Sequence, residues 1–128
     1  MPHIVKAALA YVLPVFAVAF VLGALRVTLI APRTGALMAV ALEVPVVLVL
    51  SWIVAGRVMG RWPVTTGQRP VVAVIAFALL MLLELLTALA FGQTPAQFLA
   101  AMTTPAGALG LAGQVGFGLI PLLRQARG

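Results

Sequence analysis

The sequence predicts an all-α fold, a membrane four-helix bundle with a short interfacial helix between its third and fourth spans. Three observations predict this fold class. Hydrophobic residues make up 64% of the 128 residues and charged residues only 8%, whereas a typical soluble domain is about one quarter charged. The chain contains four apolar runs, each close to the roughly 20 residues that a helix needs to cross hydrocarbon. The runs are continuous and rich in alanine and leucine, without the alternation of a β-barrel strand.

The four expected spans belong to one integral membrane domain that comprises residues 1–128. They are the apolar runs of residues 4–25, 36–55, 71–91 and 106–123. Pro14 lies inside the first run and Pro45 inside the second. Because a proline removes one helical hydrogen bond, we expect a kink at each of them.

The first apolar run has a second interpretation, as a signal peptide. The short basic leader "MPHIVK" precedes it, and Gly23 and Ala24 are small enough for a cleavage site. The length of the run and the bulky Leu22 beside that position favour a retained helix instead. Cleavage of the first helix in the cell stays open on this basis.

The segment between the third and fourth runs, "GQTPAQFLAAMTTPAGALG", contains two signals for the start of a helix. The stretch "TPAQ" from Thr94 has the form of a capping box with proline at the first helical position. A second threonine–proline pair follows at Thr104. We therefore expect residues 95–102 to form a short helix at the outer membrane surface. Such a helix is either a connector that shields the bundle or a lid over a cavity.

The basic residues are distributed unevenly between the two ends of the expected bundle. One end carries six of them, Lys6, Arg57, Arg61, Arg69, Arg124 and Arg127. The other end carries Arg26 and Arg33. The positive-inside rule then places both the N-terminus and the C-terminus on the cytoplasmic side of a bacterial inner membrane. The net charge of +6 thus comes from basic residues at the ends of apolar runs. Membrane orientation explains this placement, so we expect no nucleic-acid partner.

Four polar side chains are expected at one depth in the outer half of the bundle. At 1.5 Å per residue, Glu43 and Glu84 each lie about 10 Å from the outer end of their helix, and Gln114 lies about 12 Å down. Arg26 lies at the outer end of the first span, and its long side chain can reach the same layer. The sequence thus predicts an intramembrane polar cluster.

The charges in this cluster must be compensated. A charged side chain in the middle of a membrane costs at least ~2.5 kcal/mol on insertion scales. Our hypothesis is that Arg26 pairs with Glu43, its neighbour across the first helical hairpin. Glu84 is then protonated at neutral pH, or hydrogen-bonded to Gln114 and Thr87.

Two interpretations of the polar cluster compete. As helix glue, it fixes the register of the bundle, and the protein is a structural or accessory subunit that packs with membrane partners. The sequence favours this interpretation. As an ion, proton or solute site, it belongs to a small oligomeric transporter or channel, proton-coupled through Glu84 and Glu43.

Glycines in the fourth run indicate close helix packing. Gly107, Gly110 and Gly118 share one narrow face with Gln114, and small residues there allow close approach to another helix. Gly113 and Gly116 lie on other faces. They suggest a contact with a second copy or another subunit, unless they simply belong to a glycine-rich helix.

The chain carries no recognisable catalytic chemistry. It has no cysteine and a single histidine, His3. One histidine and two carboxylates do not build an ordinary zinc site. No nucleophile–base pair is visible either, so we expect no enzyme activity, no cofactor and no metal. The expected partners are the lipid bilayer and further membrane subunits, in a homo-oligomer or a larger complex.

The stretch from Leu22 to Arg57 contains the segments "LRVTLIAPRTG", "LEVP" and "SWIVAGR". In these segments the chain resembles small four-helix inner-membrane proteins of proteobacteria that carry no assigned function. The resemblance covers under a third of the chain. It implies a multi-pass protein of the bacterial inner membrane and implies no activity.

Overall fold

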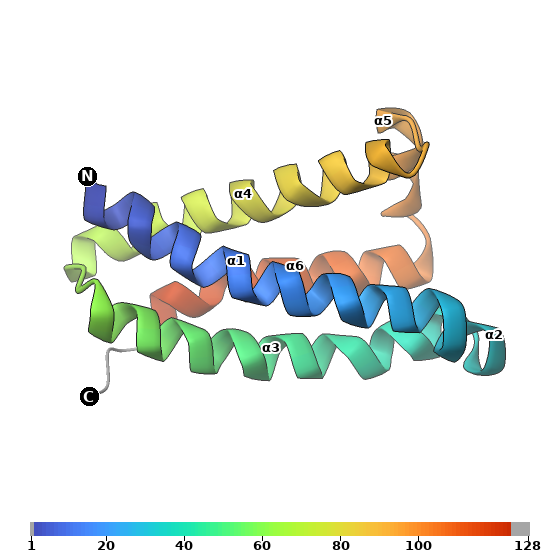
Figure 1. Ribbon diagram of the computed structural model, residues 1–128, viewed down its shortest axis with the longest axis horizontal. Coiled ribbons are helices and arrows are strands. Elements are labelled where there is room, and N and C mark those ends of the chain that lie inside the picture. Colours follow the sequence, from blue (N-terminus) through green and yellow to red (C-terminus); the bar gives the residue numbers. More distant parts are fainter. Residues whose placement is uncertain (1, 124–128) are drawn as a thin grey trace.

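The structure, a computed structural model, describes residues 2–123, and these residues form helices without any strand (Figure 1). Within them, four helices are long and apolar enough to cross a membrane. They are α1 (Pro2–Leu25), α3 (Ala36–Arg61), α4 (Arg69–Ala90) and α6 (Pro105–Leu123). The shorter elements are the π-helical turn η1 (Arg26–Ile30), α2 (Ala31–Thr34), the 3-10 turn η2 (Thr66–Gln68) and α5 (Pro95–Ala101). The predicted all-α fold with four long apolar helices is confirmed.

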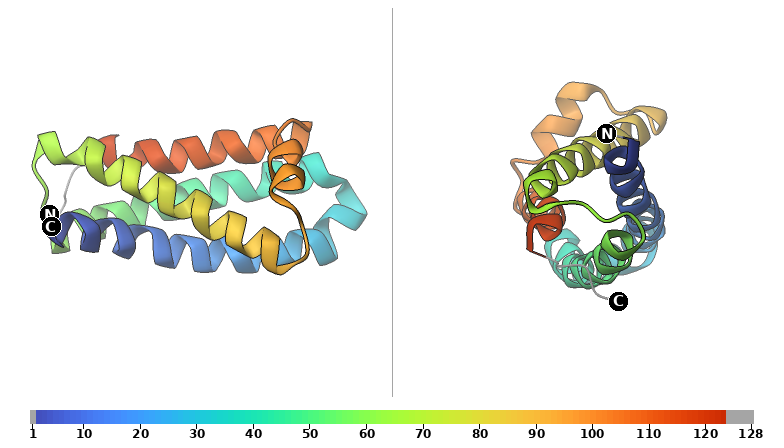
Figure 2. Two further views of the ribbon diagram at one scale, coloured as in Figure 1. Left: turned by 90° about the horizontal axis from the view of Figure 1, so that it is seen from above. Right: turned by 90° about the vertical axis from the view of Figure 1, so that its left-hand side faces the viewer.

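The four long helices run alternately up and down. Contacts place them in the cyclic order α1, α3, α6, α4, so that each packs against two neighbours. α1 begins and α6 ends at one end of the bundle, whereas α2 and α5 lie at the other end (Figure 1, Figure 2). The tail residues Arg124 and Arg127, which entered the predicted charge distribution, lie outside the described residues.

The connection between the first two spans differs from the prediction. The sequence predicts a span of residues 4–25 followed by a loop, but the chain stays helical through η1 and α2 up to Thr34. Thr28 Oγ1 donates to the carbonyl of Ala24 at 2.7 Å, which satisfies one backbone acceptor of this irregular stretch. The chain then reverses at Gly35, whose φ of 88° only glycine adopts readily.

The second span is longer than predicted. The apolar run ends at residue 55, but α3 continues to Arg61. The extra turn is held by buried residues such as Met59, which is 2% exposed. Trp62 ends the helix because the proline that follows it disfavours helical backbone. The predicted runs of residues 71–91 and 106–123 agree with α4 and α6 within two residues at each end.

The connector before the fourth span has the predicted caps. Gln97 N donates to Thr94 Oγ1 at 3.1 Å, and Thr94 N donates to Gln97 Oε1 at 2.9 Å. This reciprocal pair is the capping box, and it starts α5 one residue after the threonine. Gly107 N donates to Thr104 Oγ1 at 3.0 Å, which caps α6 by a single bond, since glycine has no side chain to return one.

The glycines of α6 pack inside the chain. Added Cβ atoms at Gly113 and Gly116 would lie 3.1 Å from Val44 and 3.0 Å from Leu48, both on α3. The suggestion that these two glycines face a second copy is therefore wrong, because α3 already occupies that space. On the predicted face, a Cβ at Gly118 would meet Phe77 of α4 at 3.2 Å, and one at Gly110 would lie 3.9 Å from α3.

The two ends of the bundle are packed differently. No residue of α1 beyond Val15 and no residue of α4 beyond Leu80 is buried. In the closed half, the Tyr11 ring stacks on Phe117 with centroids 4.4 Å apart. Tyr11 Oη donates to the Phe117 carbonyl at 2.5 Å, which joins α1 to the diagonally opposite α6. Ala39 and Val40 of α3 are buried near α2, but the two core clusters lie in the other half of the bundle, so the half near α2 and α5 is less filled.

The two mid-helix prolines lie inside continuous helices. Pro14 belongs to α1 and Pro45 to α3, and both side chains are exposed on the outside of the bundle. Proline at an outward position keeps its missing hydrogen bond away from the core. The predicted kinks at these positions stay predictions.

Candidate functional site

A cavity of about 830 Å³ occupies the half of the bundle that the buried core leaves open. All four long helices contribute to its wall, and Phe98 of α5 lines its outer end. Val15, Leu80 and Phe117 line its inner end, beside the Tyr11–Phe117 contact. In both views α4 diverges from α6 toward the α2–α5 end (Figure 1, Figure 2). The cavity lies in the half of the bundle where these two helices are farther apart.

All five members of the predicted polar cluster line this cavity. They are Arg26, Glu43, Glu84, Thr87 and Gln114. They come from η1, α3, α4 and α6, so the antiparallel arrangement brings together residues that lie up to 88 positions apart, 114 minus 26. Arg26 contacts Glu43 and Gln114 contacts Glu84, whereas the common depth of the four side chains in a membrane stays a prediction.

Arg26 and Glu43 form the predicted ion pair. Arg26 Nε donates to Glu43 Oε1 at 2.7 Å. The two side chains are 31% and 20% exposed, so the pair is partly accessible from the cavity. The guanidinium lies over Gly23, where an added Cβ would be 3.5 Å from Nη2. This distance is an ordinary van der Waals contact, so alanine would also fit at this position.

Glu84 and Gln114 form the second polar contact, which joins α4 to α6. Gln114 Nε2 donates to Glu84 Oε2. The oxygen of the same amide, Gln114 Oε1, is buried without a hydrogen-bond partner among the described residues. A buried acceptor without a donor is unfavourable by roughly 1–3 kcal/mol, so the contact between Gln114 and Glu84 has a cost to the stability of the bundle.

Thr87 does not join the cluster as expected. Its Oγ1 donates to the Leu83 carbonyl at 2.8 Å, one turn back on α4, instead of to Glu84. A threonine inside a helix commonly makes this bond, because the carbonyl four residues earlier is the nearest acceptor. Thr87 therefore lines the cavity without supporting the glutamate.

The charges in the cavity do not balance. Two carboxyl groups and one guanidinium line it, and the guanidinium is within ion-pair distance of Glu43. Glu84 lies within electrostatic range of both Glu43 and Arg26. Among the described residues, however, no basic side chain forms an ion pair with it. Glu84 is thus the carboxyl group of the cavity that lacks a cation of its own.

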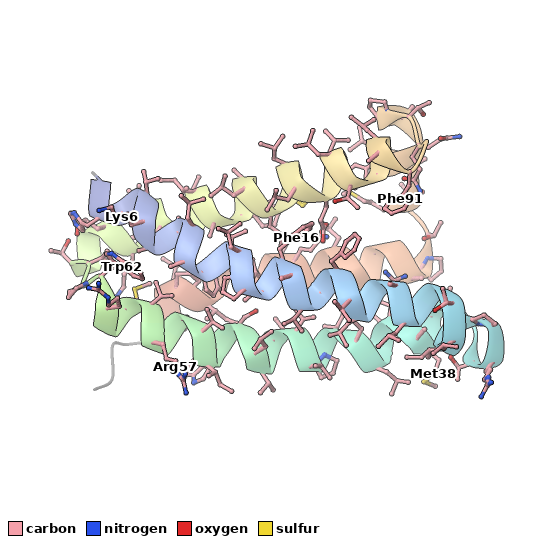
Figure 3. All side chains as sticks on the ribbon, viewed as in Figure 1. Lys6, Phe16, Met38, Arg57, Trp62 and Phe91 are labelled. Carbon is pink, nitrogen blue, oxygen red and sulfur yellow. The ribbon has the colours of Figure 1, made fainter. Side chains whose placement is uncertain are left out.

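The same cavity has an aromatic wall that the sequence did not predict. Phe16, Phe20 and Phe91 all line it. The centroids of Phe16 and Phe20 are 6.3 Å apart, and those of Phe20 and Phe91 are 6.5 Å apart. Phe16 lies on α1 and Phe91 beside the end of α4 (Figure 3). The spacing of four residues between the first two rings was the available signal, since such residues share a helix face.

Removing Arg26 is expected to destabilise the bundle. Arg26→Ala leaves the Glu43 carboxylate without its cation, and we expect the free energy of unfolding to fall by about 1–3 kcal/mol. This range lies between that of an exposed pair and that of a fully buried pair. Thermal unfolding in one detergent measures the change. Arg33→Ala, which removes an exposed arginine, is the control, and an equal loss in both variants would contradict a stabilising role for the pair.

Metal binding finds no support in the same region. Within the described residues, no three histidine or carboxylate side chains come close enough to hold a metal ion. No family model matches the chain, and comparison with curated proteins and with solved structures gave no match. Any function must therefore be inferred from the cavity and its side chains.

Proposed function

We propose that this chain is a small multi-pass protein of the bacterial inner membrane that binds a solute in its cavity and exchanges it for a proton at Glu84. The observation that carries the proposal is a cavity of about 830 Å³ with ionisable side chains on its wall. Polar groups that served only as glue would be expected in a dry, filled interior. The proposal therefore takes the transporter class, which the sequence left as the alternative.

Glu84 is the group we assign to proton exchange. Its recorded hydrogen-bond partner among the described residues is Gln114, which is neutral. An unpaired carboxylate is costly in an apolar surrounding, so this group favours either a bound proton or a bound donor or cation. A solute that supplies the hydrogen-bond donor or the cation competes with the proton for the oxygen atoms of Glu84. Such competition couples binding of the solute to release of the proton.

Gln114 holds Glu84 at the polar end of the cavity. Its amide oxygen is buried beside Glu84, accepts no hydrogen bond within the described residues and is closed off from the cavity. Recognition of a solute therefore rests on the carboxyl group of Glu84. The amide and the carboxyl group together form the polar end of a mostly apolar cavity.

The side of the membrane on which the cavity lies follows from the proposed topology. Lys6 and Arg57 lie at the closed end of the bundle (Figure 3), as do Arg61 and Arg69. The positive-inside rule places this end and both termini in the cytoplasm. The cavity then lies on the outer side of the bundle, where α5 lies along the membrane surface. Apolar side chains on the outside of the bundle face lipid or further subunits of an oligomer.

A structural or accessory role is the second candidate. It is favoured by the two polar contacts, since one joins η1 to α3 and the other joins α4 to α6. Bonds of this kind fix the register of membrane helices. In that case the cavity holds lipid tails, and the protein acts by packing with membrane partners in a larger complex.

Water access to the cavity tests the proposal. Because the chain has no cysteine, single cysteine variants can be labelled without background. Ala19 lines the cavity, whereas Ala17 is exposed on the outside of the same helix. In lipid vesicles, we expect a membrane-impermeant maleimide to label Ala19→Cys at least ten times faster than Ala17→Cys, because a thiol reacts as its hydrated thiolate.

Depth in the bilayer is controlled with a third variant. Val21 is 57% exposed and lies two residues nearer the outer end of α1 than Ala19. Slow labelling of Val21→Cys and of Ala17→Cys, with fast labelling of Ala19→Cys, assigns the reactivity to the cavity. Uniformly slow labelling at all three positions would refute a water-reachable cavity and support the structural role.

A further inference from the structure

We infer that the solute taken by this cavity is a lipophilic cation, meaning a singly charged amine or onium group with aromatic or alkyl substituents. The charge would lie against Glu84 and the substituents against the aromatic wall of Phe16, Phe20 and Phe91. This inference rests on the proposed function and names the substrate class of that same site. It follows from the charges, the aromatic rings and the apolar wall of the cavity.

The charge balance selects a cation. Arg26 is engaged with Glu43 at 2.7 Å, and Glu84 has no ion-pair partner among the described residues. With both carboxyl groups ionised and the one guanidinium present, the cluster carries one net negative charge, two minus one. A monovalent cation neutralises it, whereas an anion would have to displace Glu43 from the arginine and lie close to two carboxylates.

The aromatic wall makes the same selection independently. Phe16, Phe20 and Phe91 follow one another with centroid separations of 6.3 and 6.5 Å. The face of an aromatic ring attracts a cation and repels an anion, and the attraction grows where water is excluded. Phe20 and Phe91 are 46% and 75% exposed, so these rings on α1 and beside the end of α4 would contact the cation where the site is open.

The remaining wall selects lipophilic substituents. Most of the other lining residues are alanine, valine, leucine or glycine, contributed by all four long helices. A strongly hydrated ion or a sugar would find few polar groups there to replace its bound water. A cation with aromatic or alkyl substituents instead buries apolar surface against the wall of the cavity. The volume of about 830 Å³ falls within the range of sites for drug-sized ligands.

Two ions of nearly equal shape and opposite charge test the inference. Tetraphenylphosphonium is the cationic probe, and tetraphenylborate is its anionic match. We expect tetraphenylphosphonium to protect Ala19→Cys from maleimide labelling in vesicles and to release one proton per chain from the purified protein in detergent. Tetraphenylborate is expected to do neither at the same free concentration.

Variants assign the effect to the residues named. Glu84→Gln keeps the size of the side chain and an oxygen acceptor, so we expect it to fold, to lose proton release and to bind tetraphenylphosphonium at least ten times more weakly. Phe20→Leu is expected to weaken binding about fivefold, and Phe20→Trp to retain it. Circular dichroism and unfolding temperature show which variants are folded.

The outcomes separate this inference from the function on which it rests. If Ala19→Cys is labelled but tetraphenylphosphonium gives no protection, the substrate class is wrong and the water-reachable cavity stands. Equal protection by both ions, or protection unaltered in folded Glu84→Gln, also overturns the inference. If Ala19→Cys is not labelled at all, the proposed function fails first.

Discussion

Tyr11→Ala is expected to reduce the free energy of unfolding by about 3–5 kcal/mol, the range seen when a large buried ring is truncated. Tyr11 is 1% exposed, and its ring stacks on Phe117 at a centroid distance of 4.4 Å. Its hydroxyl also donates to the Phe117 carbonyl at 2.5 Å. The variant therefore loses ring packing and leaves a cavity at the point where α1 meets α6 across the bundle.

Unfolding by a denaturing detergent, followed by tryptophan fluorescence, measures this change. Tyr11→Phe keeps the ring and removes only the hydroxyl, so we expect a loss of about 0.5–1.5 kcal/mol. Leu13→Ala is the control on the same helix, because Leu13 is 51% exposed on the outside of the bundle. A loss in Tyr11→Ala no larger than that in Leu13→Ala would show that this contact does not hold the closed half together.

Gly107→Ala is expected to produce the second large effect, a loss of about 1–3 kcal/mol, as found for overpacked sites. A Cβ at this position would overlap the backbone oxygen of Ala101. No side-chain rotation relieves a clash with backbone, so the turn between α5 and α6 must shift. Because Phe98 of α5 and Gly107 both line the cavity, the shift should also change maleimide labelling of Ala19→Cys.

Gly110→Ala is the matched control on the next turn of α6. A Cβ there would have its nearest neighbour, Val40 Cγ1, at 3.9 Å, which is an ordinary contact. Alanine also favours helix over glycine by roughly 1 kcal/mol, so this variant should be neutral or more stable than wild type. Both substitutions replace glycine by alanine, but their expected effects on the free energy of unfolding have opposite signs. A loss of stability in both variants would mean that α6 tolerates no added side chain on this face, and that the effect at Gly107 is not specific to the α5–α6 turn.

Part of the candidate site could be predicted from the sequence. Arg26 and Glu43 are 17 positions apart across the first hairpin, and each is a rare charge in an apolar surrounding, so their pairing follows from the cost of leaving either one alone. The Glu84–Gln114 contact follows from equal depth in antiparallel helices. Thr87 could not be assigned in this way, because its own helix offers a nearer acceptor than its neighbour does.

The aromatic wall and the glycine contacts depended on which helices are neighbours. Periodicity places Gly113 and Gly116 on particular faces of α6, but it does not say that α3 covers those faces. Phe91 is separated from Phe20 by two spans, so the sequence alone does not bring the two rings together. Helix order around the bundle is a property of the tertiary structure.

The sequence by itself determined the fold class, the positions of the four long helices and the caps of α5 and α6. These features depend on local causes: the length of an apolar run, and a side chain that binds a backbone group three residues away. It did not determine where the helices end outside the apolar runs, as at Arg61 and in the helical stretch after Leu25. Only the tertiary structure decided that one half of the bundle is filled and the other is open. The size of an interior depends on how far apart helices lie, and that distance is set by side chains that meet from different helices, such as Tyr11 and Phe117.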